Sequence, residues 1–137
     1  MARIIPSLRY QDAPAAIDFL CKAFGFEKHL VVPGEEPGVI VHAQLALGDG
    51  MIMLGTSGGH GGGYDELVKA PGEVGGIGTQ SPYVIVDDAD VHHARAEAAG
   101  AEILMPPRDE PYGGRGYTCR DPEGHIWTFG TYDPLAG

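Results

Sequence analysis

The sequence predicts the same order of secondary structure twice, and this repeat restricts the fold more than any other feature. Each copy reads as a strand, a helix and then three further strands. A shift of 76 residues places Pro6 over Pro82 and the helix-capping Asp12 over Asp88. A repeat of this length indicates two equivalent modules that bury their apolar faces together. We therefore expect one domain over residues 1–137, with modules at about 1–55 and 80–137.

The first copy shows the periodicity of a helix packed on a sheet. Asp12 is a favoured N-cap residue, and Pro14 is tolerated in the first helical turn. Gly25 is expected to end the helix as its C′ residue. Four apolar residues at i, i+3, i+4 and i+7 give the helix one apolar stripe: Ile17, Leu20, Cys21 and Phe24. Strands are predicted at residues 4–10, 26–32, 39–47 and 51–54, the last two joined by a hairpin turn.

The second copy ends in a hairpin with a DPEG turn at residues 121–124. Asp-Pro favours a turn because proline holds φ at about −65° and keeps the preceding residue out of helical geometry. Gly124 supplies a residue that accepts positive φ. Before this hairpin we expect a strand at 81–86 and a helix at 91–99 that is capped by Asp88 or Asp90 and ends at Gly100. A strand at 103–105, stopped by Pro106 and Pro107, is expected to follow.

Between the copies, residues 56–79 predict a connector rather than a packed element. Residues 55–79 contain ten glycines, and glycine at this density does not hold a strand or helix without partners. One helical turn is expected within residues 64–70. Because long loops in compact domains are often functional, a mobile flap over a binding site, centred on the glycine run 58–63, is the alternative interpretation. The G-K-[ST] pattern of a phosphate loop is absent from this sequence.

Composition excludes several classes of function. A net charge of −10 and a pI of about 4.8 argue against a nucleic-acid partner, since phosphate binding needs basic patches. No run is apolar enough to cross a membrane, and the start of the chain lacks the apolar core of a signal peptide. Cys21 and Cys119 each lie in an apolar run without a C-x-x-C partner. We therefore expect reduced thiols in a cytoplasmic protein.

The DPEG turn followed by a short apolar strand, together with the repeat, resembles the vicinal oxygen chelate superfamily. That superfamily includes glyoxalase I, extradiol dioxygenases, fosfomycin-resistance enzymes and bleomycin-resistance proteins. The resemblance covers nearly the whole chain outside the connector. It implies an α+β fold of two βαβββ modules, whose curved, mixed and mostly antiparallel sheets surround a cavity. It also implies a homodimer, because related proteins complete their sheets or cavities across a two-fold axis and single modules leave open edges.

The resemblance also indicates where a metal would be held, and this chain departs from the family there. Metal-dependent members place ligands in the first and last strand of each module. The corresponding positions here are Ile5, Met53, Ser81 and Thr128. These side chains lack the imidazole and carboxylate groups that offset the desolvation of a divalent ion. We therefore predict no metal and no other cofactor.

The histidines do not replace these missing ligands. His92 and His93 are adjacent, so they are expected to point to different faces of their helix and to lie in water. His29 is alone in its strand, and His125 is expected at the rim of a sheet. His42 lies on the polar face of its strand, which the resemblance implies lines the cavity. A histidine there is more often a hydrogen-bonding group than a metal ligand.

The resemblance implies that the four ligand positions face the cavity. From them strand alternation nominates the other residues that line it, because side chains alternate between the two faces of a sheet. The expected ligand-binding residues are Ser7, Arg9, His42, Gln44, Met51, Met53, Tyr83, Tyr117 and Thr128. Thr118 is the alternative to Tyr117, since the bend at residues 113–114 leaves the alternation there ambiguous. Trp127 and Phe129 are expected to face the helices as core. No pattern of nucleophile and base or of paired carboxylates assigns a catalytic residue.

These features favour a binding protein over an enzyme. We predict metal-independent binding of a small organic, antibiotic-like molecule, similar to the bleomycin-resistance branch. The alternatives are a glyoxalase-, lyase- or dioxygenase-type enzyme with a displaced metal site, and an accessory module that acts only through protein contacts. The acidic chain favours the approach of cations while Arg9 opposes a purely cationic ligand, so the expected ligand is cationic or zwitterionic.

Overall fold

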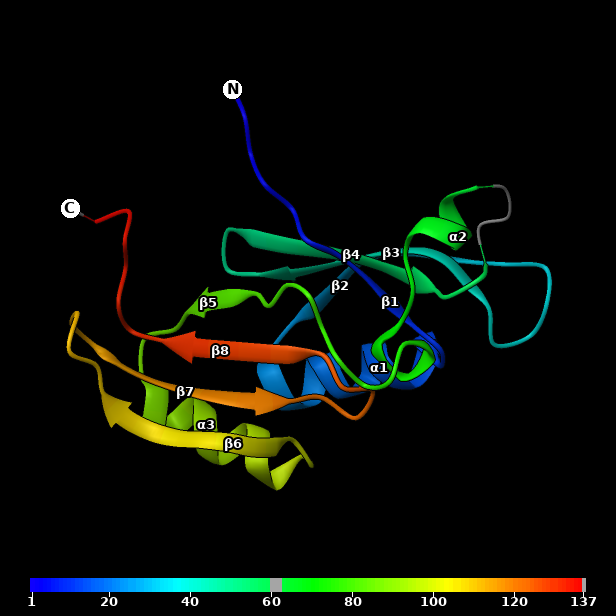
Figure 1. The fold of residues 1–137 in the computed structure, drawn as a ribbon. Helices are drawn as coiled ribbons and strands as arrows, with labels where there is room; N and C mark the ends of the chain where they lie inside the picture. The colour runs from blue at the N-terminus through cyan, green and yellow to red at the C-terminus, as the bar shows by residue number, and fades with distance from the viewer. Residues whose placement is uncertain (60–62, 137) are drawn as a thin grey trace.

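The structure, a computed structural model, describes residues 1–59 and 63–136. Residues 60–62, part of the glycine run considered as a flap, lie outside the described residues. The chain forms two four-stranded sheets (Figure 1). The first has the spatial order β1 (Ser7–Tyr10), β4 (Gly50–Thr56), β3 (Ile40–Leu47) and β2 (Glu27–Pro33). The second has the matching order β5 (Tyr83–Ile85), β8 (Ile126–Gly130), β7 (Arg115–Arg120) and β6 (Glu102–Asp109).

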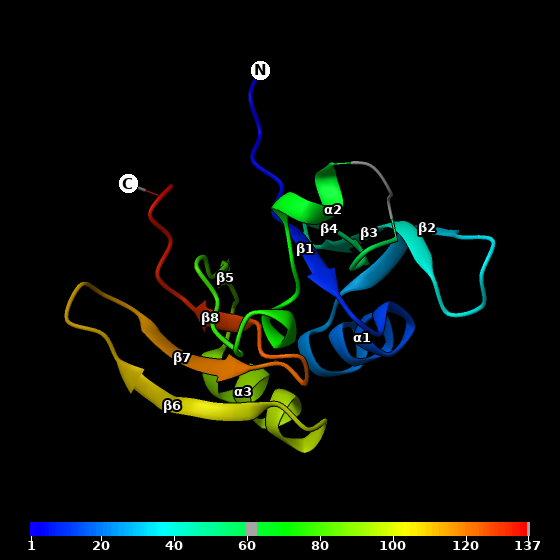
Figure 2. The same ribbon diagram turned by 45° about the vertical axis from the view of Figure 1, so that its right-hand side comes forward.

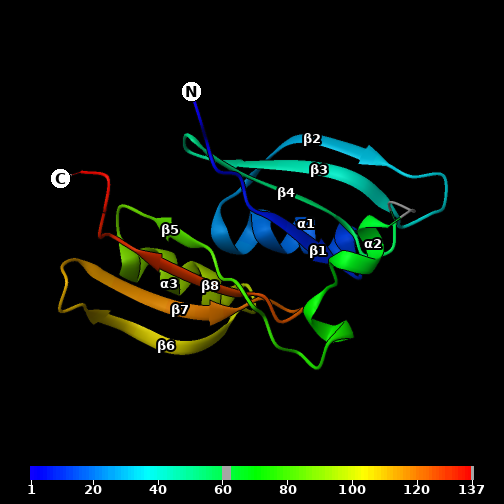
Figure 3. The ribbon, with the colours of Figure 1, turned by 45° about the horizontal axis from the view of Figure 1, so that its top comes forward.

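Strand direction confirms the predicted pair of βαβββ modules. β1 runs parallel to β4 and β5 runs parallel to β8, while the other neighbouring strands are antiparallel. The connecting helices are α1 (Ala13–Phe19), which continues as one π-helical turn η1 (Leu20–Phe24), and α3 (Ala89–Ala98). Figure 3 shows both helices behind the sheets, so that one face of each sheet packs on helices and the other is turned outward.

Local signals position both helices. The Asp12 carboxylate accepts a hydrogen bond from the N–H of Ala15 at 3.2 Å, and Asp88 accepts one from Val91 at 3.0 Å. Such N-caps satisfy backbone donors that the helix itself leaves free. Gly25 follows η1 with a φ of 91°, the left-handed conformation that favours glycine. The predicted cap and end of the first helix are thus confirmed, and of the two candidates for the second helix, Asp88 and Asp90, the cap is Asp88.

β6 is longer than predicted, because the expected stop at Pro106 and Pro107 is wrong. The strand continues through both prolines to Asp109. β6 lies at the edge of its sheet, where a residue without an N–H need not break a ladder. Its pairing with β7 also shifts register between Met105 and Arg108, which accommodates the missing donors.

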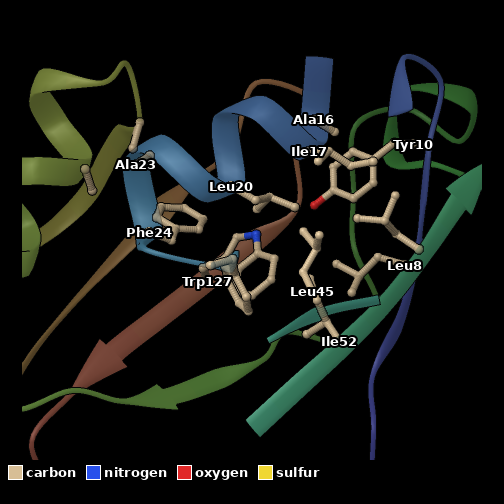
Figure 4. Close-up of a cluster of buried hydrophobic side chains, with 14 of the residues drawn as sticks. Leu8, Tyr10, Ala16, Ile17, Leu20, Ala23, Phe24, Leu45, Ile52 and Trp127 are labelled. Atoms are coloured by element: carbon tan, nitrogen blue, oxygen red, sulfur yellow. The ribbon is translucent and has the colours of Figure 1, made fainter. Parts of the chain in front are cut away.

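One core joins the two modules (Figure 4). Trp127 of β8 is fully buried and lies 5.3 Å, between ring centroids, from Phe24 of η1. Phe129 lies 4.6 Å from the same phenylalanine. Figure 4 shows Trp127 beside Leu20 and Leu45 of the first module. The prediction that Trp127 and Phe129 face the helices as core is therefore confirmed.

The DPEG turn of the second module is bound to the first module through Asp121. This carboxylate is buried, and it accepts hydrogen bonds from the Tyr10 hydroxyl at 2.7 Å and the Trp127 indole N–H at 3.1 Å. It also accepts the backbone N–H groups of Glu123 and His125 within its own turn. Burial and the neighbouring Asp121 charge raise the pKa of Tyr10, so this tyrosine stays a donor.

Two further contacts attach the same turn to the first module. The Glu123 carboxylate accepts the backbone N–H groups of Gln11 and Asp12 at 2.6 and 2.8 Å. The His125 ring, directly before the start of β8, bonds through Nε2 to the carbonyl of Arg9 at 2.7 Å. The turn therefore holds the end of β1 and the start of α1 against the second sheet.

His92 is not in water, contrary to prediction, but joins α3 to both modules. Its Nδ1 lies 2.6 Å from the Tyr117 hydroxyl and its Nε2 lies 2.9 Å from the Phe24 carbonyl. The neutral ring with its proton on Nε2 satisfies both contacts. Because His92 and His93 are adjacent, they point to different faces of α3. The sequence does not show that the face with His92 packs against η1.

This buried histidine predicts a loss of stability in acid. Burial lowers the pKa of His92 below its ordinary value, so the unfolded chain takes up a proton more readily than the folded one. We expect the free energy of unfolding to fall below pH about 6.5, by at most about 1.4 kcal/mol per pH unit from this group. Above that pH its contribution is constant. Urea unfolding at several pH values should show that His92→Gln removes this slope and that the control His93→Gln retains it; equal slopes in wild type and His92→Gln would contradict the assignment.

Two expectations from composition can also be compared with the structure. Cys21 and Cys119 are both free, as predicted. Within residues 1–59 and 63–136, no helix has the length and apolar character needed to cross a bilayer.

Candidate functional site

Six of the nine predicted ligand-binding residues share the outward face of the first sheet. The strand register pairs Ser7 of β1 with Met53 of β4, and pairs Met53 in turn with Gln44 of β3. Paired residues on neighbouring strands point to the same face, and alternation adds the residues two positions away. The six are Ser7, Arg9, His42, Gln44, Met51 and Met53. Leu8, Tyr10, Leu45 and Leu54 occupy the opposite face and are buried.

A pocket of about 250 Å³ lies over this face. It is lined by Ser7, Arg9, His42, Met53, Leu54 and Tyr64. Arg9 is only 4% exposed, and its guanidinium carbon lies 4.8 Å from the centre of the Tyr64 ring, a cation–π contact. Tyr64 begins α2 (Tyr64–Leu67), the predicted helical turn of the connector. Sequence reasoning did not place Tyr64 in the site, because a glycine-rich segment offers no periodicity from which to assign a face.

A chain of hydrogen bonds positions His42 beside the pocket. Its Nε2 lies 2.9 Å from Gln44 Oε1, and Gln44 Nε2 lies 2.9 Å from His29 Nδ1. An amide has one acceptor and one donor group, so one histidine donates to Gln44 and the other accepts from it. His29 reaches this face because the pairing of β2 with β3 shifts register between Lys28 and Leu30. The shift is not visible in the sequence, and His29 was not predicted to join the site.

A second, larger cavity of about 560 Å³ adjoins the first pocket, since Ser7 and Tyr64 line both. Its remaining walls are the start of β1, the connector that follows α2, and the residues before β5. In Figure 2 this connector descends from α2 between the two modules toward β5. A helical turn η2 (Pro71–Glu73) anchors it, because the Glu73 carboxylate accepts the Ala70 N–H at 3.0 Å and the Ser57 hydroxyl. The two adjoining cavities are called the cleft below.

The predicted residues of the second sheet do not line the cleft. Tyr83 and Thr128 lie on the outward face of that sheet, where the Tyr83 hydroxyl donates to the Tyr132 carbonyl at 2.7 Å. Thr128 Oγ1 lies 2.9 Å from Thr118 Oγ1. The choice of Tyr117 over Thr118 is wrong. Tyr117 is 2% exposed and faces α3, since the bend before β7 reverses the alternation assumed for it.

The positions at which the family holds a metal do not fit one here. Ile5 and Met53 offer no charged or imidazole donor, and Ser81 and Thr128 offer only neutral hydroxyls. Within the described part of the chain, no three His, Cys, Asp or Glu side chains come together in a group able to hold a metal ion. Divalent ions of the kinds these enzymes use are bound by such donors.

Comparison with known proteins agrees with this fold. The family model described as "Glyoxalase/Bleomycin resistance protein/Dioxygenase superfamily" matches residues 3–129. The uncharacterised protein Mb0911c of Mycobacterium bovis is 33% identical over 125 residues, which cover 91% of this chain and 80% of that protein.

Two solved structures illustrate the range of similarity. TioX from Micromonospora sp. ML1 has a TM-score of 0.69 and 36% identity, covering 95% of this chain and 98% of that one. The fosfomycin resistance protein FosX from Mesorhizobium loti has a TM-score of 0.63 and 15% identity, covering 98% and 94%, a likeness of fold alone. With two βαβββ modules and a family match over nearly its whole length, this chain belongs to the glyoxalase/bleomycin resistance protein/dioxygenase superfamily.

Proposed function

We propose that this protein binds a small organic, antibiotic-like molecule in the cleft, without a metal and without a chemical step. The observation that carries the proposal is the lining of the smaller pocket. Met53, at a position where metal-dependent relatives hold a ligand, is here part of a wall with Ser7, Arg9 and His42. A thioether at this position supports contact with an organic molecule rather than coordination of a hard cation.

The size and chemistry of the cleft support the same function. The larger cavity, of about 560 Å³, is in the range of small-molecule sites, and the adjoining pocket of about 250 Å³ enlarges it. Apolar residues form much of the walls of the larger cavity, including Leu67, Val74 and Ile77. A few polar groups, among them Ser7 and His42, would orient a ligand by hydrogen bonds. Methionine adapts to irregular apolar shapes, so Met53 suits a ligand with rings or branches.

Metal analysis of the purified protein tests this proposal against the enzyme alternative. We expect nickel, zinc, iron and manganese to be well below one equivalent, and we expect ligand binding to survive treatment with a chelator. Stoichiometric metal that is removed by the chelator together with an enzymatic activity would establish the alternative, an enzyme with a displaced metal site.

A further inference from the structure

Three polar side chains on the outward face of the first sheet form one hydrogen-bonded chain that ends at the smaller pocket. His42 lines this pocket, whereas Gln44 and His29 lie outside it. Nε2 of His42 lies 2.9 Å from Oε1 of Gln44, and Nε2 of Gln44 lies 2.9 Å from Nδ1 of His29. His29 is exposed at the far end of the chain. A single amide therefore connects an exposed histidine to the wall of the pocket.

The amide fixes the nitrogen on which each ring carries its proton. A carbonyl oxygen only accepts, so His42 carries a hydrogen on Nε2. An amide N–H₂ group only donates, so Nδ1 of His29 is bare. With both rings neutral, each is then the Nε2–H tautomer, which is the more stable of the two in water. Turning the amide over requires the less stable Nδ1–H tautomer in both rings, so the observed orientation is favoured.

We propose that Gln44 and His29 position His42 so that its Nδ1 is a hydrogen-bond acceptor for the ligand, which meets it with a donor such as a phenolic hydroxyl or an amide N–H. The inference rests on the proposed function and adds the polar group by which the ligand is selected. A neutral imidazole with its proton on Nε2 keeps a lone pair on Nδ1. No described residue donates a hydrogen bond to that nitrogen. A ligand without a donor leaves this acceptor desolvated and unpaired, which weakens binding.

Two substitutions of His29 separate this positioning role from a structural one. The carboxylate of His29→Glu only accepts, so Gln44 should keep its orientation and His42 its proton on Nε2. The ammonium of His29→Lys only donates, so Gln44 should turn its oxygen toward the lysine and its N–H₂ group toward His42. The proton of His42 then has to move to Nδ1. Because His29 is exposed, both variants should fold, and circular dichroism checks this.

Nitrogen NMR of the isotope-labelled, full-length protein reads the tautomer of His42 directly at about pH 8, where an ordinary histidine is neutral. The signals of His42 are identified as those absent from His42→Gln. Wild type and His29→Glu should show a protonated Nε2 and a bare Nδ1, and His29→Lys should show the reverse. The same tautomer of His42 in both His29 variants would overturn the inference. This measurement needs no ligand, so that result leaves the proposed function standing.

Two neutral probes that differ in one donor test the ligand preference: naphthol and its methyl ether, methoxynaphthalene. Calorimetric titration at the same pH should show naphthol binding about two- to tenfold more tightly to wild type and to His29→Glu, the effect of one neutral hydrogen bond. The preference should vanish in His29→Lys. A preference that is absent from wild type, or that persists in His29→Lys, would overturn the assignment of a ligand donor while binding in the cleft stands. If neither probe binds at millimolar concentration, the proposed function fails together with this assignment.

Discussion

Asp121→Ala is expected to destabilise the protein by about 3–5 kcal/mol, the cost of leaving several buried donors without an acceptor. The substitution removes the acceptor of the Tyr10 hydroxyl and of the Trp127 indole N–H, together with that of two backbone N–H groups in the turn. Because Tyr10 belongs to the first module and Asp121 to the second, the loss should also loosen their contact.

Urea unfolding followed by circular dichroism measures this effect. Asp18→Ala is the control, since Asp18 is an exposed aspartate on α1 and its loss should change the free energy of unfolding by no more than about 0.5 kcal/mol. Asp121→Asn keeps one acceptor oxygen and should fall between the two. If Asp121→Ala is as mild as the control, then the DPEG turn does not bind the modules together.

Trp127→Ala is the second large effect, with an expected loss of about 3–5 kcal/mol from lost burial and the cavity left behind. Trp127 is fully buried and lies 5.3 Å from Phe24 and 5.8 Å from Phe26, both of the first module. Removing the indole therefore opens a cavity at the junction of the modules. Figure 4 shows how much of the core surrounds this ring.

Trp127 is the only tryptophan of the chain, so unfolding of this variant must be followed by circular dichroism rather than by indole fluorescence. Trp127→Phe should recover part of the stability, because a smaller cavity remains. Tyr112→Ala provides the control, since this aromatic is 57% exposed and should be nearly neutral. A loss at Trp127 no larger than that at Tyr112 would contradict the shared core.

The fold could be predicted because its signals are local and occur twice. N-caps at Asp12 and Asp88, a helix-ending glycine at Gly25 and the alternation in β3 each depend on a few neighbouring residues. Where several local signals favour the same secondary structure, tertiary packing is consistent with that structure and does not change it. The prolines of β6 are the exception, since their effect depends on whether the strand lies at the centre or the edge of the sheet.

The candidate site could be predicted only for residues in regular strands, where alternation assigns each side chain to a face of the sheet. Alternation placed Ser7, His42 and Met53 on one face correctly, because β1, β3 and β4 pair there without a bulge. It failed for Tyr117, which follows a bend at two glycines. Tyr64 could not be assigned to the site by alternation, because it lies in a glycine-rich connector without a periodic pattern. Its contact with Arg9 arises only from the tertiary structure.

The docking of the second module was also hidden in the sequence. The DPEG segment predicts a local turn. Nothing in its pattern shows that Asp121 accepts a hydrogen bond from the hydroxyl of Tyr10, 111 residues away in the chain. His92 was missed for the same reason, because its partners Phe24 and Tyr117 come from other elements. Long-range hydrogen bonds of this kind become visible only when the elements have been placed.

The melting temperature of chelator-treated protein, with and without ligand, tests most directly whether the cleft binds organic molecules without a metal. A panel of glycopeptide and aromatic antibiotics is added to protein whose metal content has been measured as negligible. A ligand at about 100 times its dissociation constant adds about 2.7 kcal/mol to the free energy of unfolding. For a domain of this size we expect a rise of roughly 5–15 °C, unchanged by prior chelation. A rise that disappears on chelation and returns with a divalent metal would contradict metal-independent binding.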